Sequence, residues 1–155
     1  MLEITQKLEE LNQKAEELFG IRVQFQAEMN SRLTSTAGRA FYQRNLLQFS
    51  TTLYQSNKAA FLQDTVPHEF CHLLAFQLYG EEGCGHGTMW KKTMEALGYQ
   101  PQRCHSYEVP QRKAKTTEYT CGCQVHYITP QRKAWMTRGK VYSCVKCGNV
   151  IKELV

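Results

Sequence analysis

The sequence has no uncharged apolar run that approaches the ~18 residues needed to cross a membrane. Its first residues form neither the basic n-region nor the apolar h-region of a secretory signal. It also has no internal repeat and no low-complexity tract, so nothing in it indicates a repeat array. At 155 residues with ordinary apolar content, we expect one domain, or one domain with a small appendage. Because a membrane span and a secretory signal are both missing, we expect a cytoplasmic protein without a membrane partner. We expect it to be a monomer.

Acidic residues are scarce in the C-terminal third. Residues 101–155 carry ten Lys or Arg against three Asp or Glu, which gives +7, whereas residues 1–100 carry nine against eleven, which gives −2. The net charge of +5 therefore belongs to the C-terminal part. A basic segment of this size attracts nucleic acid or another polyanion by counterion release, or it is a solvated basic surface. Composition leaves both interpretations open.

The seven cysteines are an odd number, which argues against a complete set of disulfides in a secreted chain. Four of them form two close pairs about twenty residues apart, a spacing typical of a structural zinc site in a reducing compartment. The simplest ligand set is Cys121, Cys123, Cys144 and Cys147. Alternatively, His126 pairs with Cys123 on the first side and leaves Cys121 spare. Of the others, Cys71 is expected in the core, Cys84 in a loop, and Cys104 has no partner by spacing.

The first half of the chain changes its hydrophobic period. Apolar residues at spacings of three and four predict a helix over 4–19 that ends at Gly20. β-like alternation then predicts strands over 21–27, 32–37, 40–42 and 46–53, with turns at Gly38 and 43–45. We therefore expect an α+β fold, with a small, mostly antiparallel sheet of three or four strands packed on helices.

Two further helices follow. The first begins at a cap, Asp64 or Thr65, and ends at Gly80, and the second runs over 88–97 after a glycine-rich loop. Residues 101–120 are polar and basic, which is typical of a linker. We thus predict a domain over 1–100, a basic linker over 101–120, and a zinc-ribbon-like β module over 121–155.

The first of these helices carries the sequence HEFCH at residues 68–72, which matches the HExxH motif. Residues four apart share one face of a helix, so His68 and His72 can bind one metal ion with Glu69 beside it. A catalytic zinc takes a third protein ligand. The continuation HExxHxxGxxH fails here, because Ala75 and Leu78 stand at its glycine and histidine positions. Two candidates remain, Glu95 and His86, and we favour His86 because Gly85 and Gly87 let the backbone approach a metal.

These residues resemble the SprT-like, or Spartan-like, zinc metalloproteases. The resemblance rests on the HEFCH helix, the HGxxW element at residues 86–90, the strand-rich segment 36–53 and the C-terminal cysteine module. Residues 105–110 also look like a short family element. The resemblance implies that His68, His72 and His86 bind a catalytic zinc and that Glu69 is the catalytic residue. One departure is the first cysteine pair, Cys121-Gly122-Cys123, where the family often has C-x-x-C.

The resemblance also implies an activity: zinc-dependent hydrolysis of peptide bonds in DNA-bound or DNA-crosslinked proteins. In HExxH chemistry, zinc lowers the pKa of its water toward ~7 and the glutamate transfers the proton to the leaving amine. A rival hypothesis is a nucleic-acid-binding regulatory zinc protein with no independent proteolytic activity. It is motivated by the basic C-terminal part and by the small size of the chain, which leaves little room for a substrate cleft.

Basic and aromatic residues alternate within the cysteine module. Such a surface binds single-stranded nucleic acid, since cations contact phosphates and rings stack on bases. Aromatic residues at strand period in a small ribbon are equally typical of its core. The nucleic-acid candidates are Arg132, Lys133, Trp135, Arg138 and Lys140.

Overall fold

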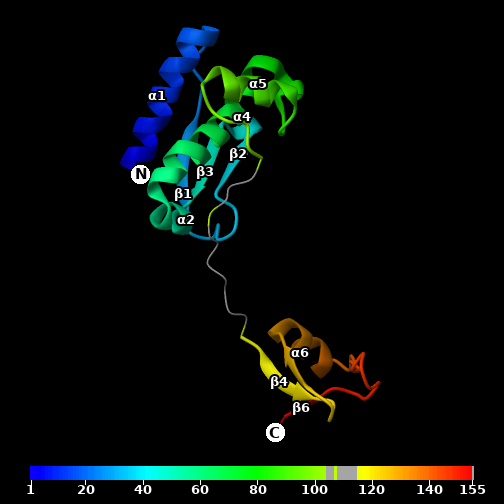
Figure 1. The fold of residues 1–155 in the computed structure, drawn as a ribbon. Coiled ribbons are helices and arrows are strands. Elements are labelled where there is room, and N and C mark those ends of the chain that lie inside the picture. Colours follow the sequence, from blue (N-terminus) through cyan, green and yellow to red (C-terminus); the bar gives the residue numbers. More distant parts are fainter. Residues whose placement is uncertain (104–106, 108–114, 155) are drawn as a thin grey trace. The chain divides into compact units, whose positions relative to one another are not determined.

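The computed structural model describes residues 1–103, 107 and 115–154. Its fold is α+β and forms two compact units, Met1–Pro110 and Gln111–Val155, each combining a small sheet with helical structure (Figure 1). In the described part of the chain, no helix combines the length and the apolar character that a bilayer span requires.

The first helix, α1 (Leu2–Phe19), confirms the prediction from hydrophobic period. Its buried face includes Ile4 and Leu8, and it ends at Gly20, whose φ of 72° is one that glycine adopts at low cost. The next residues do not form the strand expected from residue 21. Asn12 of α1 exchanges two side-chain hydrogen bonds with the backbone of Val23, so this backbone is already paired and the first strand starts only at Gln26.

The sheet of the first unit is mixed, not mostly antiparallel. It contains β1 (Gln26–Asn30), β2 (Gly38–Phe41) and β3 (Leu46–Ser50) in the order β1-β3-β2. The β2–β3 pair is antiparallel, as predicted, but β1 pairs parallel to β3. β3 is buried along nearly its whole length, consistent with its place at the centre of the sheet between β1 and β2. The turn after β2 was predicted correctly, at Tyr42–Arg44 with Asn45 in the left-handed conformation.

Two strand predictions were wrong at the end of the sheet near Ser50. The predicted strand over 32–37 consists of turns and bends, and the one over 46–53 ends at Ser50. The Ser50 hydroxyl donates to the Leu33 carbonyl at 2.6 Å and accepts from the Leu53 amide at 3.1 Å. Ser50 thereby caps a helix, because its oxygen satisfies an amide that the first turn leaves unpaired. Gly38, predicted as a turn, is the first residue of β2.

The remaining helical segments of the first unit are α2 (Thr51–Ser56), α3 (Lys58–Ala60), the π-helix η2 (Phe61–Thr65), α4 (Val66–Tyr79), the 3-10 helix η3 (Gly80–Gly83) and α5 (Thr88–Ala96). The helix α4 begins directly after Thr65, one of the two predicted caps, but Thr65 makes no capping hydrogen bond, because helical backbone already precedes it from Lys58. Buried Phe61 explains the earlier start, since its ring packs edge-on against Phe49 and Tyr54. The helix predicted over 88–97 is confirmed.

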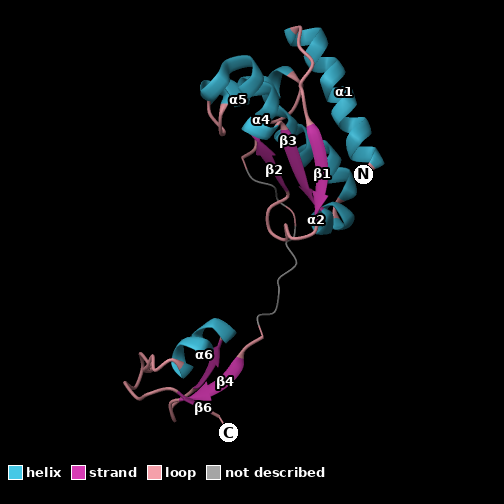
Figure 2. Cartoon of the chain, turned by 180° about the vertical axis from the view of Figure 1, so that it is seen from behind, coloured by secondary structure: helices cyan, strands magenta, loops and turns pink. Residues whose placement is uncertain are grey.

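The core of the first unit lies between α4, α1 and the sheet. Figures 1 and 2 show α4 against one face of the sheet, and in the view from behind the strands lie in front of it. Phe70 of α4 is fully buried and its ring meets Phe25 at a centroid distance of 6.3 Å. Trp90 of α5 is also fully buried. This packing holds the HEFCH helix rigidly in the interior.

The second unit has an antiparallel sheet in the order β5-β4-β6 and one helix. Its elements are β4 (Thr117–Thr120), β5 (Val125–Ile128), α6 (Pro130–Thr137) and β6 (Lys152–Glu153). The strand β4 starts before residue 121, within the segment predicted as a linker. The helix α6 was not predicted; Thr129 caps it by accepting from the Arg132 amide, and Pro130 stands at its first position. Within the predicted linker 101–120, residues 104–106 and 108–114 lie outside the described residues.

Candidate metal centre

Two imidazoles come from one face of α4. His68 and His72 lie one turn apart, and their Nε2 atoms are 3.2 Å from each other. The apolar residues of the same helix are buried in the core, which fixes the direction in which the two rings point. Burial and the neighbouring His68 and His86 lower the pKa of His72 to about 3, so its ring is neutral and carries a free lone pair for a metal.

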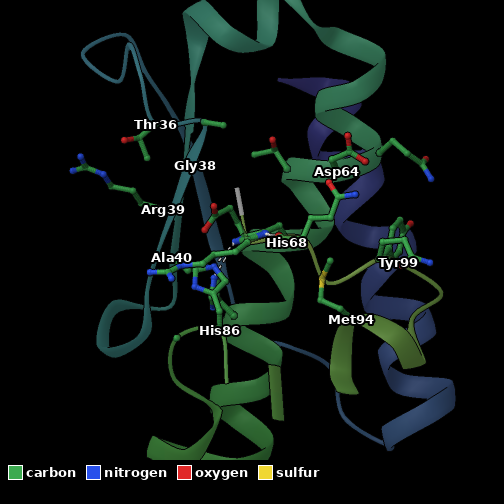
Figure 3. A pocket seen from close by; sticks show the side chains of 18 of the residues that line it. Thr36, Gly38, Arg39, Ala40, Asp64, His68, His86, Met94 and Tyr99 are labelled. Carbon is green, nitrogen blue, oxygen red and sulfur yellow. Dashed lines mark hydrogen bonds between the residues drawn. The ribbon is translucent and has the colours of Figure 1, made fainter. Parts of the chain in front are cut away.

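A tight loop after α4 brings a third imidazole to the first two. Its backbone passes so close to α4 that a Cβ on Gly83 would lie 2.1 Å from the Ala75 carbonyl oxygen. Gly85 then turns the chain with a φ of 67°. As a result, the Nε2 atoms of His86 and His68 are 2.9 Å apart (Figure 3). The favoured candidate His86 therefore joins the group, whereas Glu95 is exposed on α5 and does not.

The three histidines fit a single tetrahedral zinc ion. Their ligand atoms all lie within 4.8 Å of one another. Zinc–nitrogen bonds of 2.0–2.1 Å in tetrahedral geometry require nitrogens about 3.3 Å apart. The observed 3.2 and 2.9 Å match that requirement closely. Among the described residues three protein ligands converge, which is the number that leaves a catalytic zinc a position for a water molecule or substrate.

The outer nitrogens of the two α4 histidines have partners as well. His68 Nδ1 lies 3.1 Å from the Gln102 carbonyl oxygen, and His72 Nδ1 lies 3.3 Å from the Tyr42 hydroxyl. Trp90 packs against all three imidazoles with centroid distances of 4.7–5.3 Å. Sequence analysis found Trp90 through the HGxxW element but missed Tyr42 and Gln102. They carry no local signal, because they approach the histidines only in the folded chain.

Glu69 lies in a slot made by the absence of a side chain on β2. A Cβ built on Gly38 would be 2.5 Å from Glu69 Cγ and 2.9 Å from its Oε1, so only glycine leaves room there. The carboxylate is 7% exposed, and burial raises the pKa of Glu69 to about 8. A cation held by the neighbouring histidines acts in the opposite direction, since opposite charge favours the ionised carboxylate.

The four cysteines of the second unit form a second group. Their sulfur atoms lie within 4.8 Å of one another, and the Cys123–Cys144 separation of 3.8 Å suits two thiolates on one zinc. Gly122, with φ 88°, lets Cys121 and Cys123 face the same point despite the contracted spacing. His126 stands outside this group, with its Nε2 3.2 Å from the Cys121 sulfur. The arrangement thus favours four cysteine ligands and makes His126 a neighbour of one of them.

Comparison with known proteins identifies the family of the chain. The SprT-like family matches residues 3–113, which is most of the chain. This chain belongs to the SprT-like family. Protein SprT of Pseudomonas putida strain KT2440 is 36% identical over 154 residues, covering 96% of this chain and 93% of that protein. Protein SprT of Pseudomonas aeruginosa strain LESB58 is 38% identical over 128 residues, covering 76% and 78%. No solved structure gives a significant match.

A pocket of ≈ 720 Å³ opens beside the three grouped histidines and Glu69 of this SprT-like chain. Figure 3 shows Arg39 and Ala40 of β2 on one side of His68 and His86, with Met94 and Tyr99 on the other. Asp64 also lines it. The rival hypothesis assumed that a small chain leaves little room for a substrate; this pocket removes that premise.

Of the other described cysteines, Cys71 and Cys84 belong to neither group. Cys71 faces the core, as predicted, where burial raises the pKa of its thiol, and Cys84 lies half-buried in the loop before His86. Cys104 lies outside the described residues, as does all of the segment 105–110 except Tyr107. The Tyr107 hydroxyl contacts Thr65 at 2.8 Å and its ring stacks on Phe61.

The nucleic-acid candidates lie on α6 and in the residues after it. Lys140 lies over the ring of Trp135 at 4.9 Å, and Arg132 over Tyr142 at 6.0 Å. Trp135 is 39% exposed. Lys133 pairs with Glu153, so part of its charge is already neutralised, whereas Arg138 is exposed. We call the residues Arg132, Trp135, Arg138 and Lys140 the basic-aromatic face.

Proposed function

We propose that this protein is a zinc-dependent endopeptidase that cleaves proteins bound or crosslinked to DNA. The observation that carries the proposal is the buried carboxylate of Glu69, held beside three histidines grouped for one metal ion, at a pocket of ≈ 720 Å³. Membership of the SprT-like family supports it. A donor set of three imidazoles is one that catalytic zinc uses.

In this proposal, His68, His72 and His86 hold the metal through Nε2. Zinc bound there would supply Lewis acidity for the scissile carbonyl and for the attacking water. Glu69 accepts the proton of that water at its carboxylate and returns it to the leaving amide nitrogen. Gly38 keeps the carboxylate in place, since any side chain there would push it aside. Trp90, fully buried against the imidazoles, excludes water from their far side.

We also propose a structural zinc in the second unit. Only a few buried apolar residues make its core, centred on Tyr119, Ile128 and Ile151. So small a core cannot stabilise a fold alone, and a tetrahedral thiolate site contributes folding free energy directly.

The purified chain is therefore expected to contain two zinc ions. His86→Ala should retain only one, because two protein ligands hold a catalytic zinc poorly, and Cys147→Ser should lose the other. Cys84→Ser is the matched control and should keep both, since Cys84 belongs to neither group. Zinc per chain by mass spectrometry of the metal measures this. His126→Ala should also keep two; loss of zinc in that variant would make His126 a ligand.

For the DNA partner, the basic-aromatic face is the surface that we propose. Single-stranded DNA binding should weaken as salt rises, because phosphate contacts release counterions. Trp135→Ala should cost about 1–3 kcal/mol of binding through lost base stacking. Lys133→Ala should cost less, since Lys133 already pairs with Glu153. Fluorescence anisotropy with labelled oligonucleotides measures both, and an affinity that does not change with salt would contradict the proposal.

The proposal as a whole is tested by cleavage of a DNA-bound protein, with and without removal of zinc by a chelator. Cleavage that stops on chelation and returns when zinc is added supports it. A zinc-loaded chain that binds DNA and cleaves nothing would support the rival function, a regulatory zinc protein without independent proteolytic activity.

A further inference from the structure

Tyr42 stands between two elements that supply metal ligands. It follows β2 and begins the turn to β3, and its ring packs on Phe76 of α4 at a centroid distance of 5.1 Å. The edge of the ring also meets His72. This packing directs the hydroxyl toward the outer side of the His72 imidazole and toward the loop that carries His86.

The Tyr42 hydroxyl oxygen is an acceptor for two N–H groups. A metal bound at Nε2 needs the lone pair there, so the proton of a neutral His72 is on Nδ1. That N–H donates to the Tyr42 oxygen, 3.3 Å away. The backbone N–H of Gly85 donates to the same oxygen at 3.0 Å. The oxygen thus accepts two hydrogen bonds, which uses both of its lone pairs.

We propose that Tyr42 is a positioning residue of the metal centre. Its hydroxyl fixes His72 in the tautomer that binds metal through Nε2, and it holds the Gly85 backbone so that His86 reaches the other two histidines. One side chain therefore couples ligands from α4 and from the loop. The inference rests on the metal site of the proposed function and does not depend on peptide cleavage.

The corresponding hydrogen bond of His68 Nδ1 cannot be removed by a side-chain substitution. His68 Nδ1 meets a backbone carbonyl, that of Gln102, which stays whatever side chain occupies residue 102. For His72 the partners include a side-chain hydroxyl, that of Tyr42, besides the backbone of Gly85. Tyr42→Phe deletes this hydroxyl while the ring can keep its contact with Phe76. Outer partners of metal-binding histidines typically contribute 10- to 100-fold in metal affinity.

The test is zinc affinity of the full chain, by competition with a chromophoric chelator. The affinity measured is that of the zinc lost in His86→Ala, and the cysteine-bound zinc serves as an internal reference. Tyr42→Phe should bind this zinc about 10- to 100-fold more weakly. Tyr54→Phe is the matched control and should bind as the parent does, because its buried hydroxyl bonds Glu3 and no metal ligand.

A second measurement needs no variant. Nitrogen-15 spectra of histidines in the zinc-loaded parent should show His72 as the Nδ1–H tautomer, with that proton protected from exchange. Zinc affinity of Tyr42→Phe within twofold of the parent would overturn the inference alone. An Nε2–H tautomer of His72 would overturn the inference and metal binding through Nε2 together. A parent chain without the zinc that depends on His86 would overturn the proposed metal centre and this inference with it.

Discussion

Replacing Glu69 by glutamine is expected to slow peptide-bond cleavage by about 10²- to 10⁴-fold, the usual contribution of a general acid–base group. The zinc content should stay unchanged, because the three histidines do not depend on Glu69 for their position. Glutamine has the shape of glutamate and fits the slot beside Gly38, but it cannot accept the proton of the attacking water. Cleavage of a DNA-bound protein, followed by gel electrophoresis with zinc measured in parallel, gives both quantities.

The control for this substitution is Glu95→Gln. Glu95 is exposed on α5 and outside the histidine group, so this variant should cleave at the parental rate. If Glu69→Gln cleaves as fast as the parent, Glu69 is not the proton acceptor and the mechanism is wrong. If it loses zinc as well, the residue has a structural role instead.

Replacing Gly38 by alanine is expected to cost about 10²-fold in activity, the scale of a 1 Å displacement of a catalytic group. The new Cβ would lie 2.5 Å from Glu69 Cγ, so the carboxylate must move. Gly38 is not among the positive-φ glycines, and alanine meets no backbone strain there. Overpacking should lower the free energy of unfolding by about 1–3 kcal/mol. Cleavage rates and thermal unfolding measure the two effects.

The control here is Gly87→Ala. Gly87 has a φ of −74° and no atom within 4 Å of a built Cβ, although it directly follows His86. It should therefore keep parental activity and zinc. Equal activity in Gly38→Ala and the parent would show that Glu69 tolerates displacement, which contradicts a tightly positioned general base.

Local patterns predicted the parts of the site that one segment determines. Residues 68–72 share a helix face by spacing alone, and the glycine-rich loop indicated that His86 returns to that face. The cysteine pairs likewise indicated their grouping, because two close pairs about twenty residues apart are typical of one zinc site. Such features need no knowledge of the remaining chain.

The features that were mispredicted or missed depend on distant partners. Residues 21–25 alternate like a strand, but the N–H and C=O of Val23 are bonded to the Asn12 side chain and not to a neighbouring strand. Ser50 continues an apolar strand in sequence, yet its hydroxyl binds Leu33 and caps α2. Gly38 and Tyr42 matter through contacts with α4 and the His86 loop. Single-segment patterns cannot reveal contacts between different segments, which here join residues from 11 positions apart, for Asn12 and Val23, to 43 apart, for Tyr42 and Gly85.

The most direct test of the central claim is a crystal structure of the full chain with anomalous scattering measured at the zinc edge. We expect an anomalous peak for a zinc ion bound to Nε2 of His68, His72 and His86, with the Glu69 carboxylate beside the ion and not bound to it. A site without metal, or one in which Glu95 replaces His86 as the third ligand, would contradict the account.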